Sequence, residues 1–324
     1  MRILYGIQLN GNGHITRASE IIGNLNRMGF VVDIIASGNN SNLNLPYKIE
    51  RKFKGLSLYY NSKGTIDWLS SIKDANVHQL IKDTKFDVSN YNLVISDFEP
   101  ISAWSAHRWG VKSINLSNQN SLLHKSAPKF NTDLIAETFL RYFAYSKNRI
   151  GIHYKEYEKG IFQPIISKKL LDSTKKKDNF VLVYLPAYSL KYLINTFKHY
   201  KKKKWIIFSK EVKSEYNYEN IKVFPPSLEK FQQNLIQCSE IITASGFSTT
   251  SEALVLGKKL WSIPIKKQYE QICNAKALKD MGIFIDDLNY NNVQKWLEGY
   301  QLIDYEWKNP IGKIITKIFE IYES

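Results

Sequence analysis

The sequence has few cysteines and no long apolar run. Its two cysteines, Cys238 and Cys273, cannot build a disulfide framework, and neither lies in a spacing typical of metal ligands. No apolar stretch approaches the ~18 residues that a membrane-spanning helix requires. The N-terminus has the pattern of a β-strand and lacks the apolar core of a signal peptide. We therefore expect a cytoplasmic protein with no membrane span and no structural disulfides.

Acidic residues are scarce as well. The 324-residue chain has 30 Asp and Glu against 45 Lys and Arg, which gives a net charge of +15. Such a balance favours anionic partners, either nucleic acid or acidic lipid. A Lys-, Asn- and Ile-rich composition would raise the charge without any functional role. The positions of the charged residues along the chain therefore say more about a possible partner than the net charge does.

The basic excess is concentrated in residues 108–155, which contain eight Lys and Arg but two Asp and Glu. Within this segment, Asn131–Tyr145 has the pattern of an amphipathic helix that carries several aromatic residues. Basic residues interleaved with aromatic ones are typical of a membrane-surface contact or a groove for single-stranded nucleic acid. A domain helix with a solvated basic face is the simpler alternative.

Length and pattern predict two domains of the α/β class. A chain of 324 residues is long enough for two separate cores. Apolar strands alternate with helical patterns in both halves, which is typical of doubly wound parallel sheets. We place one domain at residues 1–155 and the other at residues 156–324, and Pro310–Tyr322 predicts a last amphipathic helix.

The first 36 residues predict a β-α-β unit with a glycine-containing loop. Strand Arg2–Gln8 leads through loop Leu9–His14 into helix Ile15–Met28. The loop lacks the second half of the G-x-G-x-x-G pattern, and no acidic residue ends the next strand, which argues against dinucleotide binding. His14 stands at the edge where open α/β sheets bind ligands. It is a candidate general base, and a helix-start residue is the alternative.

Asp97 ends a second apolar strand, Asn92–Ser96, and is the candidate partner of the histidine. A carboxylate beside an imidazole holds its tautomer and stabilises the imidazolium that forms when an alcohol loses its proton. Glu99 is a second carboxylate that would hold an acceptor hydroxyl. Because a proline follows Glu99, Asp97 as the N-cap of helix Ile101–Arg108 is the alternative.

The second half is organised around residues 241–277. Two isoleucines lead into a Ser245-Gly246 turn, and a helix then begins with several hydroxyl residues in its first turn, which is the chemistry of an N-cap. A glycine turn that feeds a helix presents free backbone N–H groups and the positive end of the helix dipole, which suit a phosphate. The predicted phosphate seat consists of Ser245, Gly246, Phe247, Ser248 and Thr249.

Two sets of hydrogen-bonding side chains follow this turn within 30 residues. Glu252 lies one turn into the helix, where a carboxylate would accept from the two vicinal hydroxyls of a ribose. The next helix begins with residues that would hold sugar hydroxyls: Gln268, Glu270, Gln271 and Asn274. Phosphate, diol and sugar acceptors so close together indicate a nucleotide sugar.

This ordered set resembles the donor half of GT-B glycosyltransferases. The residues from Gly246 to Ala275 follow the pattern G-x(4)-SEA-x(3)-G-x(6)-P-x(3)-Q-x-EQ-x-x-NA. They are most similar to the peptidoglycan N-acetylglucosaminyltransferase type and to related bacterial and archaeal UDP-sugar glycosyltransferases. The resemblance implies two Rossmann-like domains that face a cleft, with a UDP-sugar bound by the C-terminal domain. In enzymes of this architecture the last helix commonly crosses back to the N-terminal domain.

The resemblance further assigns roles outside the motif. It implies an acceptor-side loop, formed by Asn10, Gly11, Asn12 and Gly13, that carries His14 as the base. The chain after the strand that ends at Phe224 would meet the nucleotide base. Related enzymes act on glycan or lipid-linked acceptors, which favours an anionic membrane surface over nucleic acid as the partner of the basic segment.

We therefore predict an enzyme that moves a sugar from a UDP-linked donor to an acceptor hydroxyl, with inversion, at the inner face of the membrane. No cofactor or metal is expected, since backbone N–H groups and a helix dipole can stabilise the departing diphosphate. The alternatives are a nucleotide-sugar epimerase of the same fold, a nucleic-acid-binding protein and a non-catalytic sugar-nucleotide-binding protein. An epimerase needs several acid–base groups around the sugar, and a nucleic-acid-binding protein would leave Glu252, Glu270 and Gln271 without a role.

Overall fold

The computed structural model describes residues 1–9, 12–38, 45–55, 77–130, 133–173, 178–299 and 302–324. The chain forms two compact units, Met1–Ser167 with Lys308–Ser324, and Lys168–Trp307. The sequence placed the boundary after residue 155 and left open whether the last helix belongs to the first domain. In the structure this helix, α13 (Ile311–Glu323), is part of the first unit.

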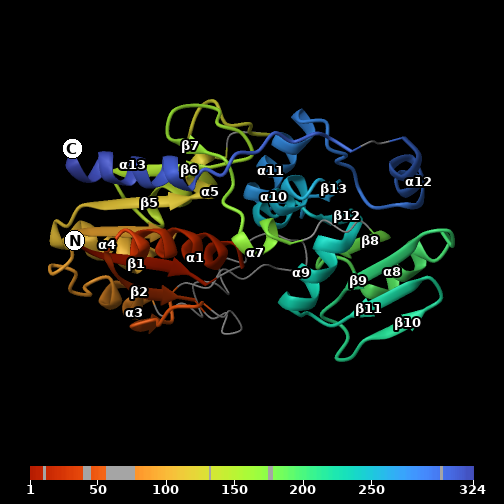
Figure 1. Cartoon of the computed structure of the whole chain (residues 1–324), viewed down its shortest axis with the longest axis horizontal. Coiled ribbons are helices and arrows are strands. Elements are labelled where there is room, and N and C mark those ends of the chain that lie inside the picture. The colour runs from red at the N-terminus through yellow and green to blue at the C-terminus, as the bar shows by residue number, and fades with distance from the viewer. Residues whose placement is uncertain (10–11, 39–44, 56–76, 131–132, 174–177, 300–301) are drawn as a thin grey trace. The chain divides into compact units, whose positions relative to one another are not determined.

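The first unit is built on a seven-stranded sheet with the order β3-β2-β1-β4-β5-β6-β7 (Figure 1). Every described strand pair in it is parallel. The two central strands are buried over nearly their whole length, as parallel strands covered on both faces are. The strands are β1 (Arg2–Gln8), β2 (Val31–Ser37), β3 (Arg51–Phe53), β4 (Leu93–Asp97), β5 (Ser113–Ser117), β6 (Asn148–Ile152) and β7 (Ile161–Phe162).

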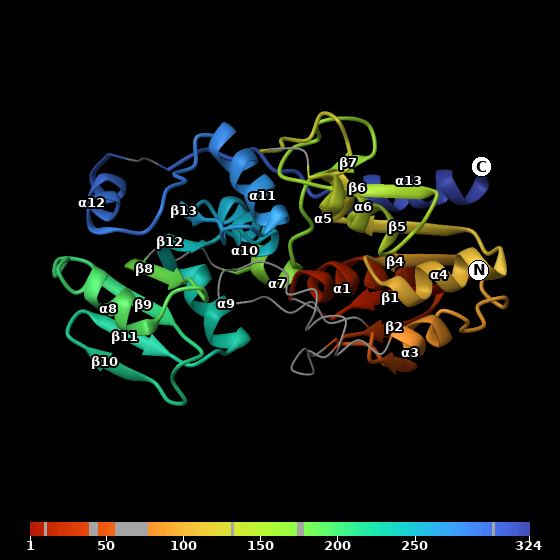
Figure 2. The ribbon, with the colours of Figure 1, turned by 180° about the vertical axis from the view of Figure 1, so that it is seen from behind.

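Helices pack against this sheet through apolar stripes. Helix α1 buries Ala18, Ile21 and Leu25 at helical spacing, and it lies beside α13, where the rings of Phe30 and Phe319 are 5.0 Å apart. Figure 2 shows α4 and α6 from the other side. The helices of this unit are α1 (Asn12–Arg27), α3 (Val77–Asp83), α4 (Pro100–Trp109), α5 (Asn118–Ser121), α6 (Leu134–Tyr142) and α13.

Two helix boundaries differ from those expected. Helix α1 begins at Asn12, so Gly13 and His14 are helical rather than part of a loop. The expected helix Asn131–Tyr145, whose first two residues lie outside the described ranges, is observed over Leu134–Tyr142. Asp133 caps its start by accepting from the backbone N–H groups of Ile135 and Ala136. Within the described ranges, no helix combines the length and apolarity needed to cross a bilayer.

The second unit has a six-stranded sheet with the order β10-β11-β9-β8-β12-β13. The expected doubly wound α/β class is confirmed for both units, but this sheet is mixed rather than purely parallel. Strand β10 runs antiparallel to β11, because the two residues between them form a tight hairpin in which Glu219 has a φ of 51°. The strands are β8 (Asp178–Tyr184), β9 (Lys204–Phe208), β10 (Tyr216–Tyr218), β11 (Ile221–Phe224), β12 (Cys238–Ala244) and β13 (Lys259–Ile263).

Three tryptophans anchor the core of the second unit. Trp205, Trp261 and Trp296 are almost fully buried, and the last two pack with ring centroids 5.8 Å apart. They hold β9, β13 and the helix α12 in one cluster. The helices of this unit are α7 (Lys168–Leu171), α8 (Leu190–Phe197), α9 (Leu228–Gln237), α10 (Phe247–Val255), α11 (Tyr269–Asp280) and α12 (Tyr290–Gly299).

Candidate active site

The structure brings His14 and Asp97 together at the carboxyl edge of the first sheet. Strands β1 and β4 are neighbours, with Ile7 paired to Asp97, so the first turn of α1 lies beside the end of β4. The Nδ1 atom of His14 is 2.7 Å from Oδ1 of Asp97. The Asp97 side chain is fully buried, whereas that of His14 keeps 12% of its surface exposed. Within the described residues no group bonds to Nε2 of His14, so this nitrogen is available to a ligand.

Arg17 completes this pair, and the sequence interpretation missed it. The residue follows His14 by one helical turn and is almost fully buried. Its Nε donates to Oδ2 of Asp97 at 2.8 Å, and its terminal NH2 group donates to Oδ1. Burial would raise the pKa of the Asp97 carboxyl, but the Arg17 charge and the contact with His14 hold this pKa below its ordinary value. Asp97 is therefore ionised at neutral pH.

A strained turn separates Asp97 from Glu99. Phe98 adopts a left-handed backbone with a φ of 51°, which is uncommon for a bulky residue and recurs at functional sites. The turn directs Asp97 towards α1, while Glu99 caps α4 by accepting from the N–H groups of Ile101 and Ser102 at 2.9 and 2.6 Å. The N-cap that we considered for Asp97 therefore belongs to Glu99.

Glu99 is fully buried with both carboxylate oxygens bonded to the backbone of α4. Burial raises the pKa of its carboxyl, and hydrogen bonds from Ser102 and Ile101 offset only part of this effect. A catalytic role for Glu99 would require it to leave the helix cap. The geometry instead gives it a structural role, because it holds the start of α4 close to β1, where Gly6 leaves the room that a side chain would fill.

The acceptor-side loop is described only in part. Asn10 and Gly11 lie outside the described residues, Asn12 is the first residue of α1, and Gly13 is partly buried in its first turn. Because Asn12 and Gly13 are helical, the position of His14 is set by the first turn of α1 and not by a loop.

On the donor side, helix α10 begins without a side-chain cap. Gly246 is its N-cap residue and, having no side chain, makes no side-chain cap hydrogen bond. The expected capping by the hydroxyls is wrong, because Thr250 turns back and donates to the carbonyl oxygens of Gly246 and Phe247 at 2.8 and 3.1 Å. Ser248 and Thr249 are partly exposed at this helix start. Uncapped N–H groups and the positive dipole end are the features that suit a phosphate.

Glu252 follows on the second turn of α10 as a carboxylate without a partner. It is partly buried, and in the part of the chain that the structure describes nothing donates a hydrogen bond or an opposite charge to it. Burial raises the pKa of this carboxyl to about 7. A desolvated acceptor with unused capacity is a group that a ligand with two hydroxyls can satisfy.

Three other predicted donor residues are engaged inside the fold. Ser245 shares a hydrogen bond of 2.7 Å with Ser262, and its carbonyl oxygen accepts from Nδ2 of Asn274 at 3.0 Å. The amide oxygen of Gln271 accepts from the N–H of Ile265 at 3.0 Å. All three side chains are buried. They hold the turns before α10 and α11 in place, a structural role that the sequence did not reveal.

The remaining donor candidates divide by exposure. Gln268 and Glu270 are partly exposed at the start of α11, just after Lys267, whose φ is 70°. The rings of Phe247 and Phe224 are buried, the latter stacked on Phe208 at 5.2 Å. Both rings are therefore largely shielded from solvent.

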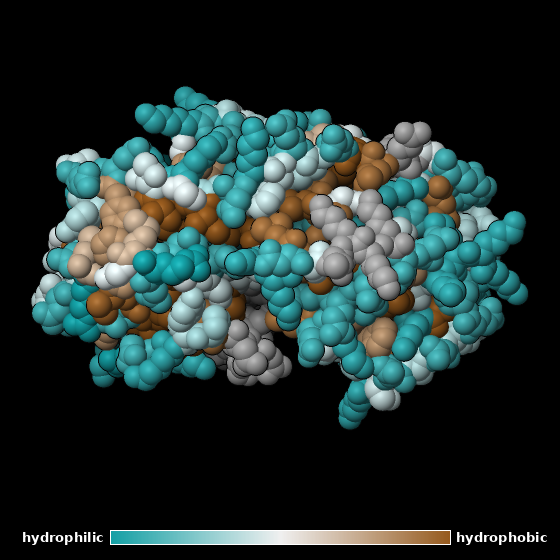
Figure 3. Space-filling view, in the orientation of Figure 1, coloured by the Kyte–Doolittle hydropathy of each residue, from teal (hydrophilic) through white to brown (hydrophobic). Residues whose placement is uncertain are grey.

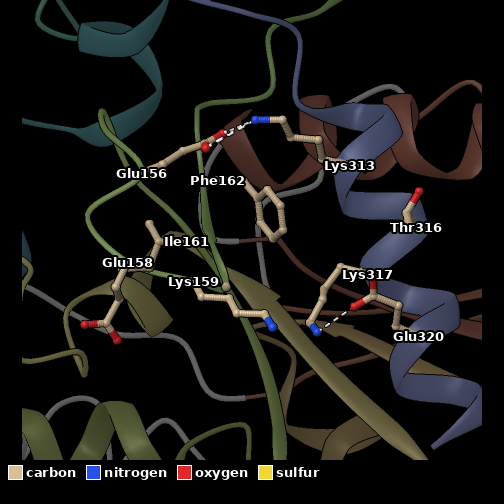
Figure 4. A pocket seen from close by; sticks show the side chains of 10 residues that line it. Glu156, Glu158, Lys159, Ile161, Phe162, Lys313, Thr316, Lys317 and Glu320 are labelled. Carbon is tan, nitrogen blue, oxygen red and sulfur yellow. Dashed lines mark hydrogen bonds and ion pairs between the residues drawn. The ribbon is translucent and has the colours of Figure 1, made fainter.

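A separate cavity of about 620 Å³ lies in the first unit between the chain around β7 and helix α13 (Figure 4). Its charged residues are largely paired with each other: Lys313 with Glu156, and Lys317 with Glu320. None of the predicted site residues lines it. We assign it no role in the reaction.

Two Rossmann-like units of this kind are the fold of GT-B glycosyltransferases. The structure is similar to that of the glycotransferase of kitacinnamycin, with a TM-score of 0.62, 12% identity, and coverage of 99% of this chain and 94% of that one. It is also similar to Arabidopsis thaliana UGT89C1 complexed with quercetin, with a TM-score of 0.60, 14% identity, and coverage of 98% of this chain and 93% of that one. A third similar structure is that of the glycosyltransferase SnogD from Streptomyces nogalater. Its TM-score is 0.54 and its identity 12%, with coverage of 100% of this chain and 95% of that one.

The sequence agrees with this class. A family model described as glycosyl transferase family 1 matches residues 1–300. The chain belongs to this family, and the GT-B resemblance read from the donor motif is confirmed. A search of curated proteins found no match.

Proposed function

We propose that this glycosyltransferase moves a sugar from a UDP-linked donor to an acceptor hydroxyl by a single displacement with inversion. The observation that carries the proposal is the bond of 2.7 Å between His14 and the buried Asp97. Because an ionised carboxylate can only accept, we assign the proton of His14 to Nδ1, which leaves a free lone pair on Nε2. A base that takes the acceptor proton opposite the leaving group leads to inversion.

The donor roles rest on α10 and α11. The backbone N–H groups at the start of α10, after Gly246, would bind the diphosphate and stabilise its charge as it departs. Glu252 would accept from the ribose hydroxyls, while Gln268 and Glu270 would reach the sugar. Similar structures were solved with nucleotides, Arabidopsis thaliana UGT89C1 with UDP and VinC with dTDP, which supports a nucleoside diphosphate donor.

A donor panel tests the first part of this proposal. The protein is mixed with UDP, dTDP, GDP and several UDP-sugars, and thermal unfolding is followed for each. A ligand present at 100 times its Kd adds about 2.7 kcal/mol to the stability of the folded state. We expect UDP and at least one UDP-sugar to raise the unfolding temperature more than GDP does. A panel in which no nucleotide raises it would contradict the proposed donor.

We also propose that transfer needs no metal ion, because the helix start supplies the positive potential that the diphosphate requires. Treating the enzyme with EDTA should leave the release of UDP unchanged. The matched measurement repeats the assay after adding magnesium or manganese. Loss of activity in EDTA that either ion restores would overturn this proposal and would make Asp97 a candidate metal ligand.

For the acceptor we propose a glycan or lipid-linked hydroxyl, reached from an anionic membrane surface. Figure 3 shows one face of the molecule, on which apolar areas are interspersed among hydrophilic side chains. On α6 the side chains of Leu134 and Ile135 are 73% and 75% exposed, and Phe130 just before it is also exposed. Arg141 and Lys125 are exposed nearby in the sequence. Apolar side chains flanked by basic ones are typical of an interfacial helix.

Vesicle sedimentation checks this surface. The protein should sediment with anionic vesicles at low ionic strength and be released as salt screens the attraction. The double variant Leu134→Glu/Ile135→Glu should lose most of this binding. Ile81→Glu, which changes an exposed apolar residue of α3, is the matched control and should retain it. If the protein sediments with neither anionic nor neutral vesicles, the proposed membrane contact is wrong and α6 is an ordinary solvated helix.

A further inference from the structure

We propose that Tyr184 is a specificity-determining residue of the donor site, whose exposed ring is the platform on which the base of the nucleotide stacks. This inference rests on the proposed function and adds a stacking side chain to the donor site. The observation behind it is a row of four aromatic rings at one edge of the second sheet. The row consists of Tyr184, Phe231, Phe208 and Phe224.

Tyr184 is the last residue of β8 and lies at the carboxyl edge of the second sheet. Strand β8 is a central strand, with β9 on one side and β12 on the other. The residues from Phe180 to Val183 are buried, whereas Tyr184 itself is 36% exposed. Because open α/β sheets bind ligands beyond the carboxyl ends of their strands, this ring is placed where a ligand can reach it.

Other aromatic rings hold the ring of Tyr184 in place. Its centroid is 5.4 Å from that of Phe231 on α9, which in turn lies 5.4 Å from that of Phe208. Phe208 stacks on Phe224 at 5.2 Å, and both of these rings are buried. A side chain that is already fixed by its neighbours loses little conformational freedom when a flat ligand stacks on it.

The other end of the aromatic row is covered by two lysines. The ammonium groups of Lys222 and Lys230 lie 4.7 and 5.1 Å from the centroid of the Phe224 ring. Both lysines also pair with Glu215, at 3.8 and 2.7 Å, which holds them over this ring. A base can therefore stack on the aromatic row at Tyr184 but not at Phe224.

The register of the sheet places Tyr184 near the predicted phosphate seat. Tyr184 pairs with Thr243 of β12, whose Oγ1 donates to the carbonyl oxygen of Tyr184 at 3.3 Å. Paired strands are about 5 Å apart, and Gly246 at the start of α10 follows Thr243 by three residues, each of which adds at most ~3.4 Å. The ribose and the first phosphate of a nucleotide can span such a separation.

The test measures the binding of UDP and of pyrophosphate to the wild type, Tyr184→Ala and Tyr184→Phe by isothermal titration. Loss of an aromatic platform typically weakens the binding of a stacked base by about 5–150-fold. We expect this loss for UDP in Tyr184→Ala, whereas pyrophosphate, which has no base, should bind as it does to the wild type. Tyr184→Phe retains the ring and should bind both ligands normally.

The matched control is Tyr218→Ala, which should bind UDP like the wild type. Tyr218 is 40% exposed and pairs with Ile221, the first residue of β11, so it lies at the opposite edge of the same sheet. Equal losses for UDP and pyrophosphate in Tyr184→Ala would mean that Tyr184 only supports the start of α10. Unchanged UDP affinity in the folded variant would mean that the base lies elsewhere. Either result overturns the proposal.

A second measurement applies if Tyr184→Ala does not fold. In the wild type, NMR should record contacts between the uracil protons of bound UDP and the ring protons of Tyr184, which are assigned by the signals lost in Tyr184→Phe. Their absence in a protein that binds UDP would overturn the proposal. A wild type that binds UDP in this way but transfers no sugar would contradict the proposed reaction alone, and one that binds no nucleotide would overturn both.

Discussion

Replacing His14 with alanine should lower turnover by about 10²–10⁴-fold while leaving the affinity for UDP nearly unchanged. The histidine would act only on the acceptor proton, whereas the groups proposed to bind the nucleotide lie on α10 and α11 of the other unit. Turnover is measured beside UDP titration for each variant. His78→Ala, which removes an exposed histidine of α3, is the matched control and should have full activity. A His14→Ala enzyme with full turnover would end the proposal.

Asp97→Asn should reduce turnover in the same direction, because the imidazole loses the partner that holds its tautomer. Since both residues would serve one proton transfer, the double variant His14→Ala/Asp97→Asn should be little worse than the poorer single one. Losses that multiply would mean separate roles. Thermal unfolding must accompany these assays, because Asp97→Asn leaves the buried Arg17 without its counter-charge and destabilises the fold.

The second large effect concerns donor binding. Glu252→Ala should weaken UDP affinity by about 10–150-fold, because it removes a charge-assisted acceptor that typically contributes ~1.5–3 kcal/mol. Isothermal titration with UDP measures the change. Glu229→Ala, which removes an exposed carboxylate on α9, is the matched control and should bind UDP normally. Unchanged affinity in a folded Glu252→Ala protein would contradict the ribose assignment.

Glu252 also predicts a pH dependence, because the pKa of its carboxyl is raised to about 7. Hydroxyls donate better to the ionised form, so UDP affinity should fall as pH decreases through 7, and this dependence should vanish in Glu252→Gln. The free energy of unfolding changes with pH in the opposite direction to the UDP affinity. Between the ordinary pKa of 4.5 and about 7 the folded state binds a proton more tightly than the unfolded one, so its contribution to stability is lost as pH rises through this window.

The sequence predicted the parts of the site that follow from strand ends. His14 and Asp97 each come directly after a buried strand or its connecting turn, and β1 and β4 proved to be neighbours, so the two side chains meet. The donor turn and the helix after it were also found, because glycine and the following motif mark them locally. Boundaries were less accurate where a cap decides them, as with Asp133 before α6.

The sequence could not predict what depends on contacts between distant segments. Arg17 reads as a solvated cation on a helix, and its partner lies 80 residues away. A cation within the apolar stripe of α1 was the available signal, since a buried charge needs a partner. Glu99, and not Asp97, is the N-cap of α4. Between them Phe98 adopts a left-handed backbone conformation, which could not be predicted because no glycine is present there. Gln271 likewise turned inward to a backbone group before its own helix.

The most direct measurement follows one reaction to its products. The wild type, His14→Ala and Glu252→Ala are each mixed with the UDP-sugar that binds best and with candidate acceptors, and ¹H NMR records UDP release and the new anomeric signal. We predict that the wild type releases UDP in step with a product of inverted configuration. His14→Ala should bind the donor without releasing UDP, and Glu252→Ala should need much more donor. A product of retained configuration, or equal turnover in all three proteins, would contradict the proposed mechanism.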